Sequence, residues 1–487
     1  MERVYTAIDK LISYAERNLM LDERNADYVK NSVFGIFGLD SYGLDKKDYD
    51  EDNLDVLLSG LSDALLENKL VEDYDLPAVL DRVMGALSKQ PKEIEDKFYE
   101  IEKTQGSKQA TEWFYDYSVK NDYVKKSKLD KNPRFEVGDL VITINKAKPE
   151  FRDSKKAASG NATKGGYPKC TICHENEGFY GRQKCTLRTI NVTLDGQKWF
   201  WQFSPYGYFY QHGIAVNYEH IPMHVDKSAF VRLMDFVDRF PHYFIGCNAA
   251  LPRIGGSVLA HDHYQGGGEI LPMHKAKAYK TFNIAGVDDA VIEVVEWYGS
   301  VVRVVSKNKK SIVDVSEKIR EAWIDYRNEE LGIINKDKEG VHHALSPTVV
   351  KTDRGYEMSL ILRSNITSEE YPDGVFHAHP EFHIIKKESI GLIEAQGLFI
   401  LPGRLEEQLE RVKENIINGE PLSDDLSDFK MVYDETVALV SGDFCKENVD
   451  DAMRKELASV CSRILDNTAV FKDKELLVDF LKGAKII

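Results

Sequence analysis

A glycine-flanked segment with two alternating histidines, GGSVLAHDHYQGGG at residues 255–268, constrains this chain more than any other stretch. If its middle forms a β-strand, His261, His263 and Gln265 project to one face, because side chains alternate along a strand. The flanking glycines let the chain turn and let a ligand approach the backbone closely. Two imidazoles and an amide on such a surface indicate phosphate chemistry, whereas a single histidine is more often structural.

Length and charge restrict the number of domains and the kinds of partner that this chain can have. At 487 residues the chain exceeds one ordinary core, so we expect roughly two to four domains. A net charge of −16 argues against a general binder of nucleic acid or of acidic membranes. The first residues carry no apolar signal region, and no apolar run approaches the roughly eighteen residues needed to span a bilayer. These features predict a cytoplasmic protein with no membrane or nucleic-acid partner.

Helical periodicity dominates both ends of the chain. Apolar residues recur three and four positions apart over residues 1–130, as in the run from Val4 to Leu19. The chain after Arg404 is also predicted to be helical. Between Glu150 and Lys169 the composition changes to Lys, Ser, Ala and Gly without any hydrophobic period, which is typical of a linker or mobile loop.

Two strand-rich blocks lie between these helical ends, and each contains a His-x-His. The first has aromatic and β-branched residues from Gln197 to Glu219, and the second runs from Thr348 to Leu401. We also predict helices at Asp289–Lys307 and Ser316–Arg327. These patterns divide the chain into four expected parts, at residues 1–150, 151–290, 291–403 and 404–487.

The motif CTIC suggests a metal site at Cys170 and Cys173. Two thiolates three residues apart can bind one soft ion from a single turn. The candidates for two further ligands are His220, His224 and His261. A closed zinc site made by Cys170, Cys173, His220 and His261 would be structural, because four protein ligands leave no position for substrate. A redox dithiol or two unligated cysteines are the alternatives.

A second histidine group, His377, His379 and His383, lies in VFHAHPEFHIIKK. It could hold another metal, contact phosphate or form a pocket wall. Pro380 interrupts the alternation, and this favours an edge strand over a central one.

If a metal occupies His261, His263 remains free to react. A neutral imidazole is a good nucleophile toward phosphorus, and the phosphorus–nitrogen bond is labile enough to pass the group onward. The attacking nitrogen requires that the opposite ring nitrogen carry a proton bonded to an acceptor such as a carbonyl. Gln265 can donate to a phosphoryl oxygen, while Ser257 and backbone N–H groups near glycines such as Gly256 can hold the others.

These motifs resemble a known family. HDHYQ, preceded by GGS and by Asn248, is similar to the His-Pro-His-x-Gln signature of galactose-1-phosphate uridylyltransferases, in the histidine-triad superfamily. The similarity extends to CTIC, to NYEHIPMHV with His220 as the third metal position, and to HAHPEFHIIKKESIGLIEAQG, so it covers roughly residues 168–400. The long helical N-terminal region and IEAQGLFILPGRL resemble the second, bacterial class of the family.

The resemblance implies an α+β fold with two histidine-triad-like antiparallel half-barrel units, at residues 151–290 and 291–403, beside the helical ends. It implies an enzyme of the Leloir pathway of galactose metabolism that moves UMP from UDP-glucose to galactose 1-phosphate through a uridylylated His263. A homodimer is also implied.

Individual residues match family positions. Cys170, Cys173, His220 and His261 match the zinc ligands. Gln265, Ser257 and Asn248 match residues near the transferred phosphate, and His377 and His379 match part of a second metal site in the first class. Asp262 replaces the usual proline, and we expect it to face away from substrate without changing the mechanism.

Two other functions use the same residues. The first is another branch of the superfamily, a different nucleotide transferase, a dinucleotide phosphorylase or a nucleotide hydrolase. A hydrolase of this superfamily usually has a third histidine where this chain has Gln265. The second is a zinc-stabilised binding or scaffolding module without catalysis.

Overall fold

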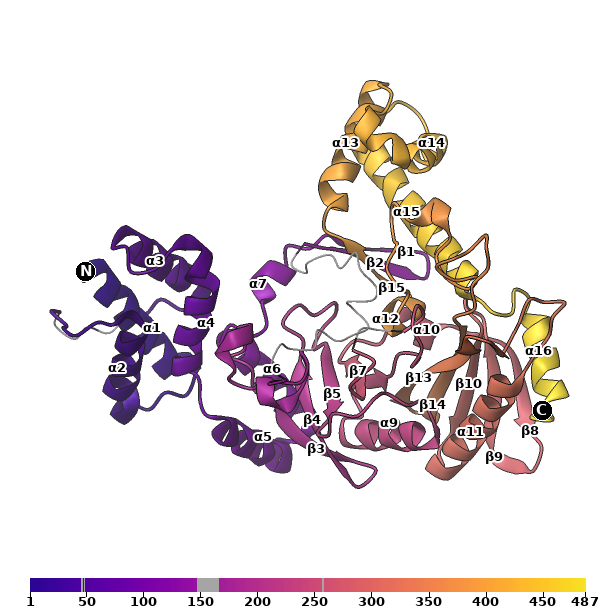
Figure 1. Ribbon diagram of the computed structural model, residues 1–487, viewed down its shortest axis with the longest axis horizontal. Helices are drawn as coiled ribbons and strands as arrows, with labels where there is room; N and C mark the ends of the chain where they lie inside the picture. Colours follow the sequence, from indigo (N-terminus) through magenta and orange to yellow (C-terminus); the bar gives the residue numbers. More distant parts are fainter. Residues whose placement is uncertain (45–46, 48, 147–165, 256–257) are drawn as a thin grey trace.

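Helices at the two ends of the chain flank a long central β-sheet (Figure 1). The structure, a computed structural model, describes residues 1–44, 47, 49–146, 166–255 and 258–487. Two predicted site residues, Gly256 and Ser257, and most of the predicted linker after Glu150 lie outside the described residues. No helix in the described part of the chain is long and apolar enough to cross a membrane.

The N-terminal region is helical, as predicted from its apolar spacing. Its helices are α1 (Glu2–Asn18), α2 (Ala26–Phe37), α3 (Leu54–Glu67), α4 (Leu76–Leu87), α5 (Pro91–Gln105), α6 (Ser107–Lys120) and α7 (Lys126–Leu129). Val4, Ile8 and Leu11 form the buried stripe of α1, which packs against α2 and α3. Asn53 begins α3 by accepting a hydrogen bond from the backbone N–H of Val56 at 3.3 Å.

Within the described residues, ten antiparallel strands form the central sheet. In spatial order they are β3 (Ile190–Leu194), β4 (Gln197–Phe203), β5 (Gly213–Asn217), β7 (His263–Gly267), β6 (Phe244–Gly246), β13 (His343–Thr352), β14 (Gly355–Ser364), β10 (Val301–Ser306), β9 (Val287–Val295) and β8 (Ala278–Ile284). The first five strands precede the last five in the sequence, and the two sets join where β6 pairs with β13. The predicted α+β fold with two antiparallel units is confirmed.

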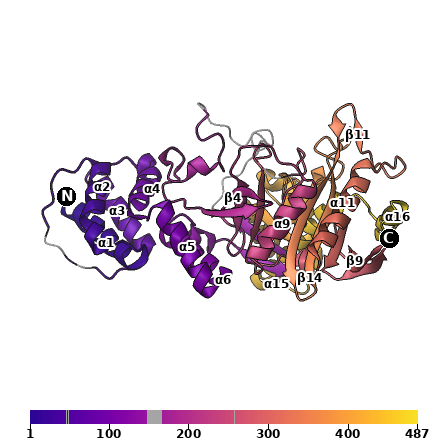
Figure 2. The same cartoon turned by 90° about the horizontal axis from the view of Figure 1, so that it is seen from below.

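One face of this sheet is covered by α9 (Lys227–Arg239) and α11 (Lys309–Asp325), which lie against each other (Figure 2). Tyr264 of β7 points toward this helix layer, where its hydroxyl accepts a hydrogen bond from Nη1 of Arg232 at 3.4 Å. Because side chains alternate along a strand, His263 and Gln265 point to the opposite face. The helix layer therefore fixes which face carries the predicted chemistry.

The opposite face packs against a smaller layer. This layer contains α10 (Pro272–Lys275), α12 (Leu392–Ala395) and the strands β1 (Arg134–Val137), β2 (Leu140–Asn145) and β15 (Leu398–Pro402). Phe244 and Val350 of the large sheet share one apolar cluster with Ile393 and Leu398 of this layer. Since β15 pairs with β2 in parallel, the end of the N-terminal region contacts the end of the second block.

The remaining elements complete the C-terminal half. They are the hairpin β11 (Lys336–Asp337) and β12 (Gly340–Val341), and the helices α13 (Leu405–Asn418), α14 (Lys430–Leu439), α15 (Lys446–Thr468) and α16 (Lys474–Gly483). The helical C-terminal region is thus present. The four proposed domain ranges stay a prediction.

Two secondary-structure predictions were wrong. Asp289–Lys307 was predicted to be a helix but forms most of β9 and all of β10, which pair with Val302 opposite Val294. Every residue of β10 is buried, so its apolar run lacks the alternation that identifies a half-buried strand. The edge strand predicted at His377–His383 is instead a loop with the short 3-10 helix η5 (Pro380–Phe382), which suits the fixed φ and missing N–H of proline.

Candidate active site and metal cluster

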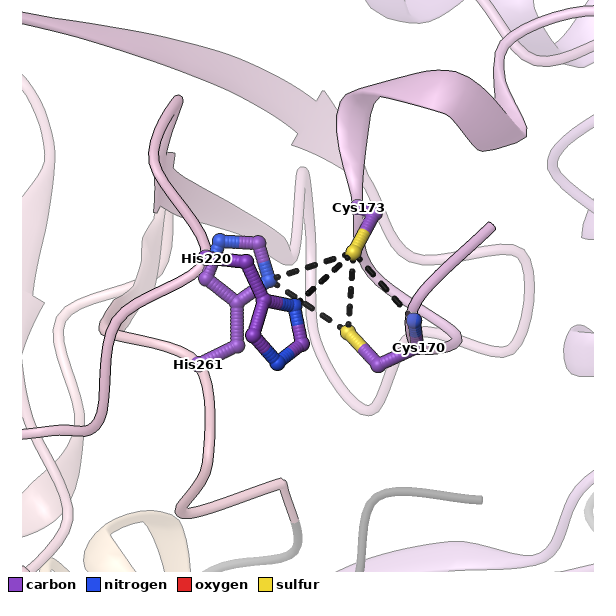
Figure 3. A group of neighbouring side chains, drawn as sticks. All are labelled: Cys170, Cys173, His220 and His261. Atoms are coloured by element: carbon purple, nitrogen blue, oxygen red, sulfur yellow. Dashed lines mark hydrogen bonds between the residues drawn. The ribbon is translucent and has the colours of Figure 1, made fainter. Parts of the chain in front are cut away.

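Cys170, Cys173, His220 and His261 converge, as predicted (Figure 3). The two sulfurs lie 3.3 Å apart. Nδ1 of His220 is 3.1 Å from Sγ of Cys173, and Nδ1 of His261 is 3.3 Å from Sγ of Cys170. In the described part of the chain this is the only such group of potential ligand atoms, all within 4.8 Å of one another. Two sulfurs and two imidazole nitrogens at these separations fit the tetrahedral donor set that zinc prefers.

Two asparagines that sequence reasoning missed orient these ligands. Nδ2 of Asn176, in the 3-10 helix η3 (His174–Asn176), donates to the backbone carbonyls of Cys170 and Cys173, both at 2.8 Å. Nε2 of His261 donates to the backbone carbonyl of Asn217 at 2.8 Å, which turns Nδ1 toward the sulfurs. Asn176 follows CTIC by three residues, and this spacing is the one signal in the sequence that could have identified it.

Two further histidines near this cluster in the sequence, His174 and the candidate ligand His224, lie outside it. His174 packs its ring on Tyr218 at 4.4 Å, and His224 is not part of the group. The hydrogen bond between the two cysteines lowers the pKa of Cys170 to about 7 and raises the pKa of Cys173 to about 11. Metal binding requires both thiols as thiolates, so it would release the thiol protons.

His261 and His263 do different things although only one residue separates them. The side chain of His261 lies against the cysteine sulfurs just before β7, whereas His263 begins the strand and its ring bonds the backbone. The backbone of Asp262 explains this difference: its N–H donates to Ile221 at 2.7 Å and its carbonyl accepts from Asn217 at 3.0 Å. These bonds hold the chain against the segment that carries His220.

His263 has the features of a nucleophile toward phosphorus. Its ring is buried, and Nδ1 donates to the backbone carbonyl of His261 at 2.8 Å. Because a carbonyl only accepts, the proton resides on Nδ1 and the lone pair resides on Nε2. Burial lowers the pKa of His263 to about 4, so the ring is neutral near pH 7. The tautomer that the sequence analysis required is therefore present.

Two amides lie on the face of the sheet that carries His263. Gly246 of β6 is paired with Gln265 of β7, and Asn248 follows the end of β6 by two residues. Oδ1 of Asn248 accepts from the N–H of Leu392 at 2.8 Å, while its buried Nδ2 has no partner among the described residues. The amide of Asn248 therefore has a donor left for a ligand.

Asp262 lies on the reverse side, as expected. Its Oδ2 is 3.3 Å from Nη1 of Arg232 on α9, in the layer that covers the face opposite His263. Burial raises the pKa of Asp262 to about 6 in spite of this ion pair. The carboxyl group of Asp262 thus contacts the helix layer and points away from His263.

The ring nitrogens of His377, His379 and His383 do not converge on one point. Nδ1 of His377 bonds the carbonyl of Ala378 at 3.1 Å, Nε2 of His379 bonds that of Val375 at 3.1 Å, and Nε2 of His383 bonds that of Ala378 at 3.0 Å. The ring of His379 also stacks on Tyr371. Among the described residues these histidines form no metal-type group, so the second metal gains no support.

The fold and the site together define a nucleotidyltransferase: a neutral histidine with a free Nε2 stands beside amide donors and a metal-type cluster. Comparison with known proteins agrees. Residues 52–222 match the family model for the N-terminal domain of galactose-1-phosphate uridyl transferase, and residues 235–431 match that for its C-terminal domain. The chain belongs to the galactose-1-phosphate uridylyltransferase family.

Several relatives match over nearly their whole length. A galactose-1-phosphate uridylyltransferase of Bifidobacterium longum is 53% identical over 99% of this chain and 98% of its own. Proteins of the same name from Clostridium acetobutylicum and Halalkalibacterium halodurans are 37% and 36% identical, each over 96% of this chain and over 96% and 95% of their own lengths. A crystal structure of yeast Ap4A phosphorylase matches 66% of this chain and 89% of its own at 11% identity, with a TM-score of 0.32, which is too low to support an inference.

Proposed function

We propose that this protein transfers UMP from UDP-glucose to galactose 1-phosphate through a covalent uridylyl group on Nε2 of His263. The observation that carries the proposal is the bond from Nδ1 of His263 to the carbonyl of His261, which leaves Nε2 as the reacting atom. Family membership supplies the class of substrate. The reaction would give UDP-galactose and glucose 1-phosphate.

The proposed reaction has two displacements. Nε2 of His263 attacks the α-phosphorus of UDP-glucose, a phosphorus–nitrogen bond forms, and the bond to the bridging oxygen breaks. Glucose 1-phosphate leaves with that electron pair. A phosphate oxygen of galactose 1-phosphate then attacks the same phosphorus, and the electron pair of the phosphorus–nitrogen bond returns to Nε2. Throughout both displacements Nδ1 of His263 keeps its proton and donates it in a hydrogen bond to the carbonyl of His261.

The neighbouring amides have supporting roles in this proposal. Nδ2 of Asn248 and the amide of Gln265 lie on the face that carries His263, and each could donate to an oxygen of the transferred phosphate. Ser257 and Gly256 are assigned to the same task from the sequence alone. His377 and His379 remain candidates for a wall of the substrate pocket.

We further propose that Cys170, Cys173, His220 and His261 would hold a zinc ion. When bound, the ion would have a structural role, because its four protein ligands leave no position for substrate. His261 links this cluster to the nucleophile, since its side chain faces the sulfurs and its backbone carbonyl holds Nδ1 of His263. The homodimer and the cytoplasmic location stay predictions.

The proposal can be tested by exchange. The enzyme is incubated with UDP-glucose and labelled glucose 1-phosphate without any galactose 1-phosphate, and the uridylylated residue is then mapped by mass spectrometry. We expect label to enter UDP-glucose and UMP to be found on His263. Steady release of free UMP from UDP-glucose alone would instead identify a hydrolase, and UMP on another residue would refute the assignment of His263.

A further inference from the structure

A cavity of about 590 Å³ lies where the N-terminal helices meet the start of the first block. Figure 1 shows α4 and α5 at this junction, between the first three helices and the sheet. The residues that line it come from α4, the start of α5 and the segment 177–188, with one from α2, and none belongs to the site around His263. They are Ile36, Arg82, Gly85, Ala86, Gln90, Pro91, Glu177, Gly178, Tyr180, Cys185 and Arg188.

Arg188 contributes a buried positive charge to this cavity. The residue is 5% exposed, and its Nε and Nη1 donate to the backbone carbonyls of Lys89, Cys185 and Leu187 at 2.6 to 2.9 Å. No carboxylate among the described residues forms an ion pair with it, and its Nη2 has no partner there. Buried charges are normally paired, so an arginine held only by carbonyls is suited to an anionic ligand.

Arg82 and Glu177 are the other charged residues of the cavity lining. Arg82 has an exposed side chain with no hydrogen bond or ion pair among the described residues. Its neighbour Asp81 does not line the cavity and accepts instead from the backbone N–H of Cys185 at 2.9 Å. The two oxygens of Glu177 accept from Thr189 at 2.7 and 3.2 Å. The lining therefore carries two guanidinium groups and one carboxyl group, and the charges of Glu177 and of nearby Asp81 also act on Arg188.

We propose that this cavity binds a phosphate monoester of about hexose size, with its phosphate held by Arg82 and Arg188. Guanidinium groups bind phosphate through paired N–H donors. The cavity volume lies in the range of small-molecule sites, roughly 300–1,000 Å³. Gln90 and Pro91 place the N-terminus of α5 at the same wall.

A ligand in this cavity would lie next to the segment that carries Cys170, Cys173 and Asn176. The cavity wall at Glu177 and Gly178 directly follows Asn176, whose amide holds the carbonyls of Cys170 and Cys173. A ligand that binds only the folded protein stabilises it by mass action. A ligand in the cavity would therefore stabilise the folded protein next to the segment that carries Cys170 and Cys173.

The test is equilibrium dialysis of the full-length, metal-loaded protein with radiolabelled glucose 6-phosphate, in the presence of saturating UDP to fill the catalytic site. We expect about one bound ligand per chain. Arg82→Met should weaken binding about tenfold or more, because it removes a charged donor. Arg24→Met removes an equally exposed arginine that does not line the cavity, and it should bind as the unaltered protein does.

A second variant tests the cavity without altering charge. Ala86 lies on the same face of α4 as Arg82, so Ala86→Leu should fill the space and prevent binding while keeping good helix propensity. Neither change removes the groups that hold Arg188, and circular dichroism checks that each variant is folded. The proposal is overturned if the UDP-saturated protein binds no glucose 6-phosphate, or if Arg82→Met and Ala86→Leu bind it normally.

Discussion

The two strand-rich blocks of this protein each contain a His-x-His, and the two pairs differ in backbone structure and in the partners of their rings. In the first block, His261 precedes β7 and faces two cysteines, while His263 begins the strand with Nε2 free. In the second block, His377 and His379 lie in a loop, and Nε2 of His379 is bonded to a carbonyl. The same three-residue pattern thus brings one histidine of the first block against two cysteine sulfurs, whereas neither histidine of the second block joins a metal-type group among the described residues.

The difference follows from what surrounds each pair. The first pair is held by the backbone of Asp262, which bonds both Ile221 and Asn217, and it adjoins the sulfurs of CTIC. The second pair is followed by Pro380, which begins η5 and ends any alternation. A histidine acquires a chemical role through the acceptor on its other nitrogen and through its neighbours, and a spacing of two residues supplies neither.

The largest expected effect tests the unequal roles of the two blocks. His263→Gly should lower the rate of glucose 1-phosphate exchange at least about 10³-fold, because it removes the nitrogen that we propose to form the covalent intermediate. His377→Asn, the matched change in the second block, removes no group that the proposed displacement uses, so it should lower the exchange rate far less than His263→Gly. Circular dichroism should be nearly unchanged in both variants. Exchange that survives in His263→Gly would show that the nucleophile lies elsewhere.

A second effect separates the metal cluster from ordinary cysteines. Cys170→Ser should reduce bound zinc from about one ion per chain to a small fraction, since it removes one of four ligands. The exchange rate should fall as well, because His261 carries both a ligand atom and the carbonyl that orients His263. Cys185→Ser is the control, because Cys185 lies outside the cluster. Metal content measured by atomic emission that is equal in the two variants would refute the zinc assignment.

For the first block, the sequence predicted which side chains lie together better than it predicted the backbone elements that carry them. CTIC and its spacing to His220 and His261 identified the cluster, and strand alternation placed His263 and Gln265 on one face. Thiols and imidazoles are rare enough that their identity restricts the possible ligands. These predictions needed only local patterns and residue types.

What the sequence could not supply is mostly backbone chemistry. The acceptors for His261 and His263 are carbonyls of Asn217 and His261, and every residue type has a carbonyl. The strand β10 was mistaken for helix because both of its faces are buried by distant elements. Contacts of this kind depend on the pairing of strands far apart in the chain, which no local pattern encodes.

The smallest expected effect concerns stability and acid. Burial lowers the pKa of His377 to about 4, whereas a histidine in an unfolded chain has a pKa near 6.5. Between these values the unfolded chain binds a proton that the folded protein excludes, so stability is complete above about pH 6.5 and falls as the pH decreases toward 4. His377 alone should lower the free energy of unfolding by about 2 kcal/mol between pH 7 and pH 5.

His377→Asn isolates that contribution, since an asparagine amide can still donate to the carbonyl of Ala378 but does not titrate. The urea midpoint of the variant should therefore fall less between pH 7 and pH 5 than that of the unaltered protein. Other buried histidines, including His274 and His343 with pKa values lowered to about 4, remain in both proteins and cancel in the difference. Equal acid sensitivity of the two proteins would mean that His377 reaches solvent, and the contrast between the two histidine pairs would then rest on hydrogen bonding alone.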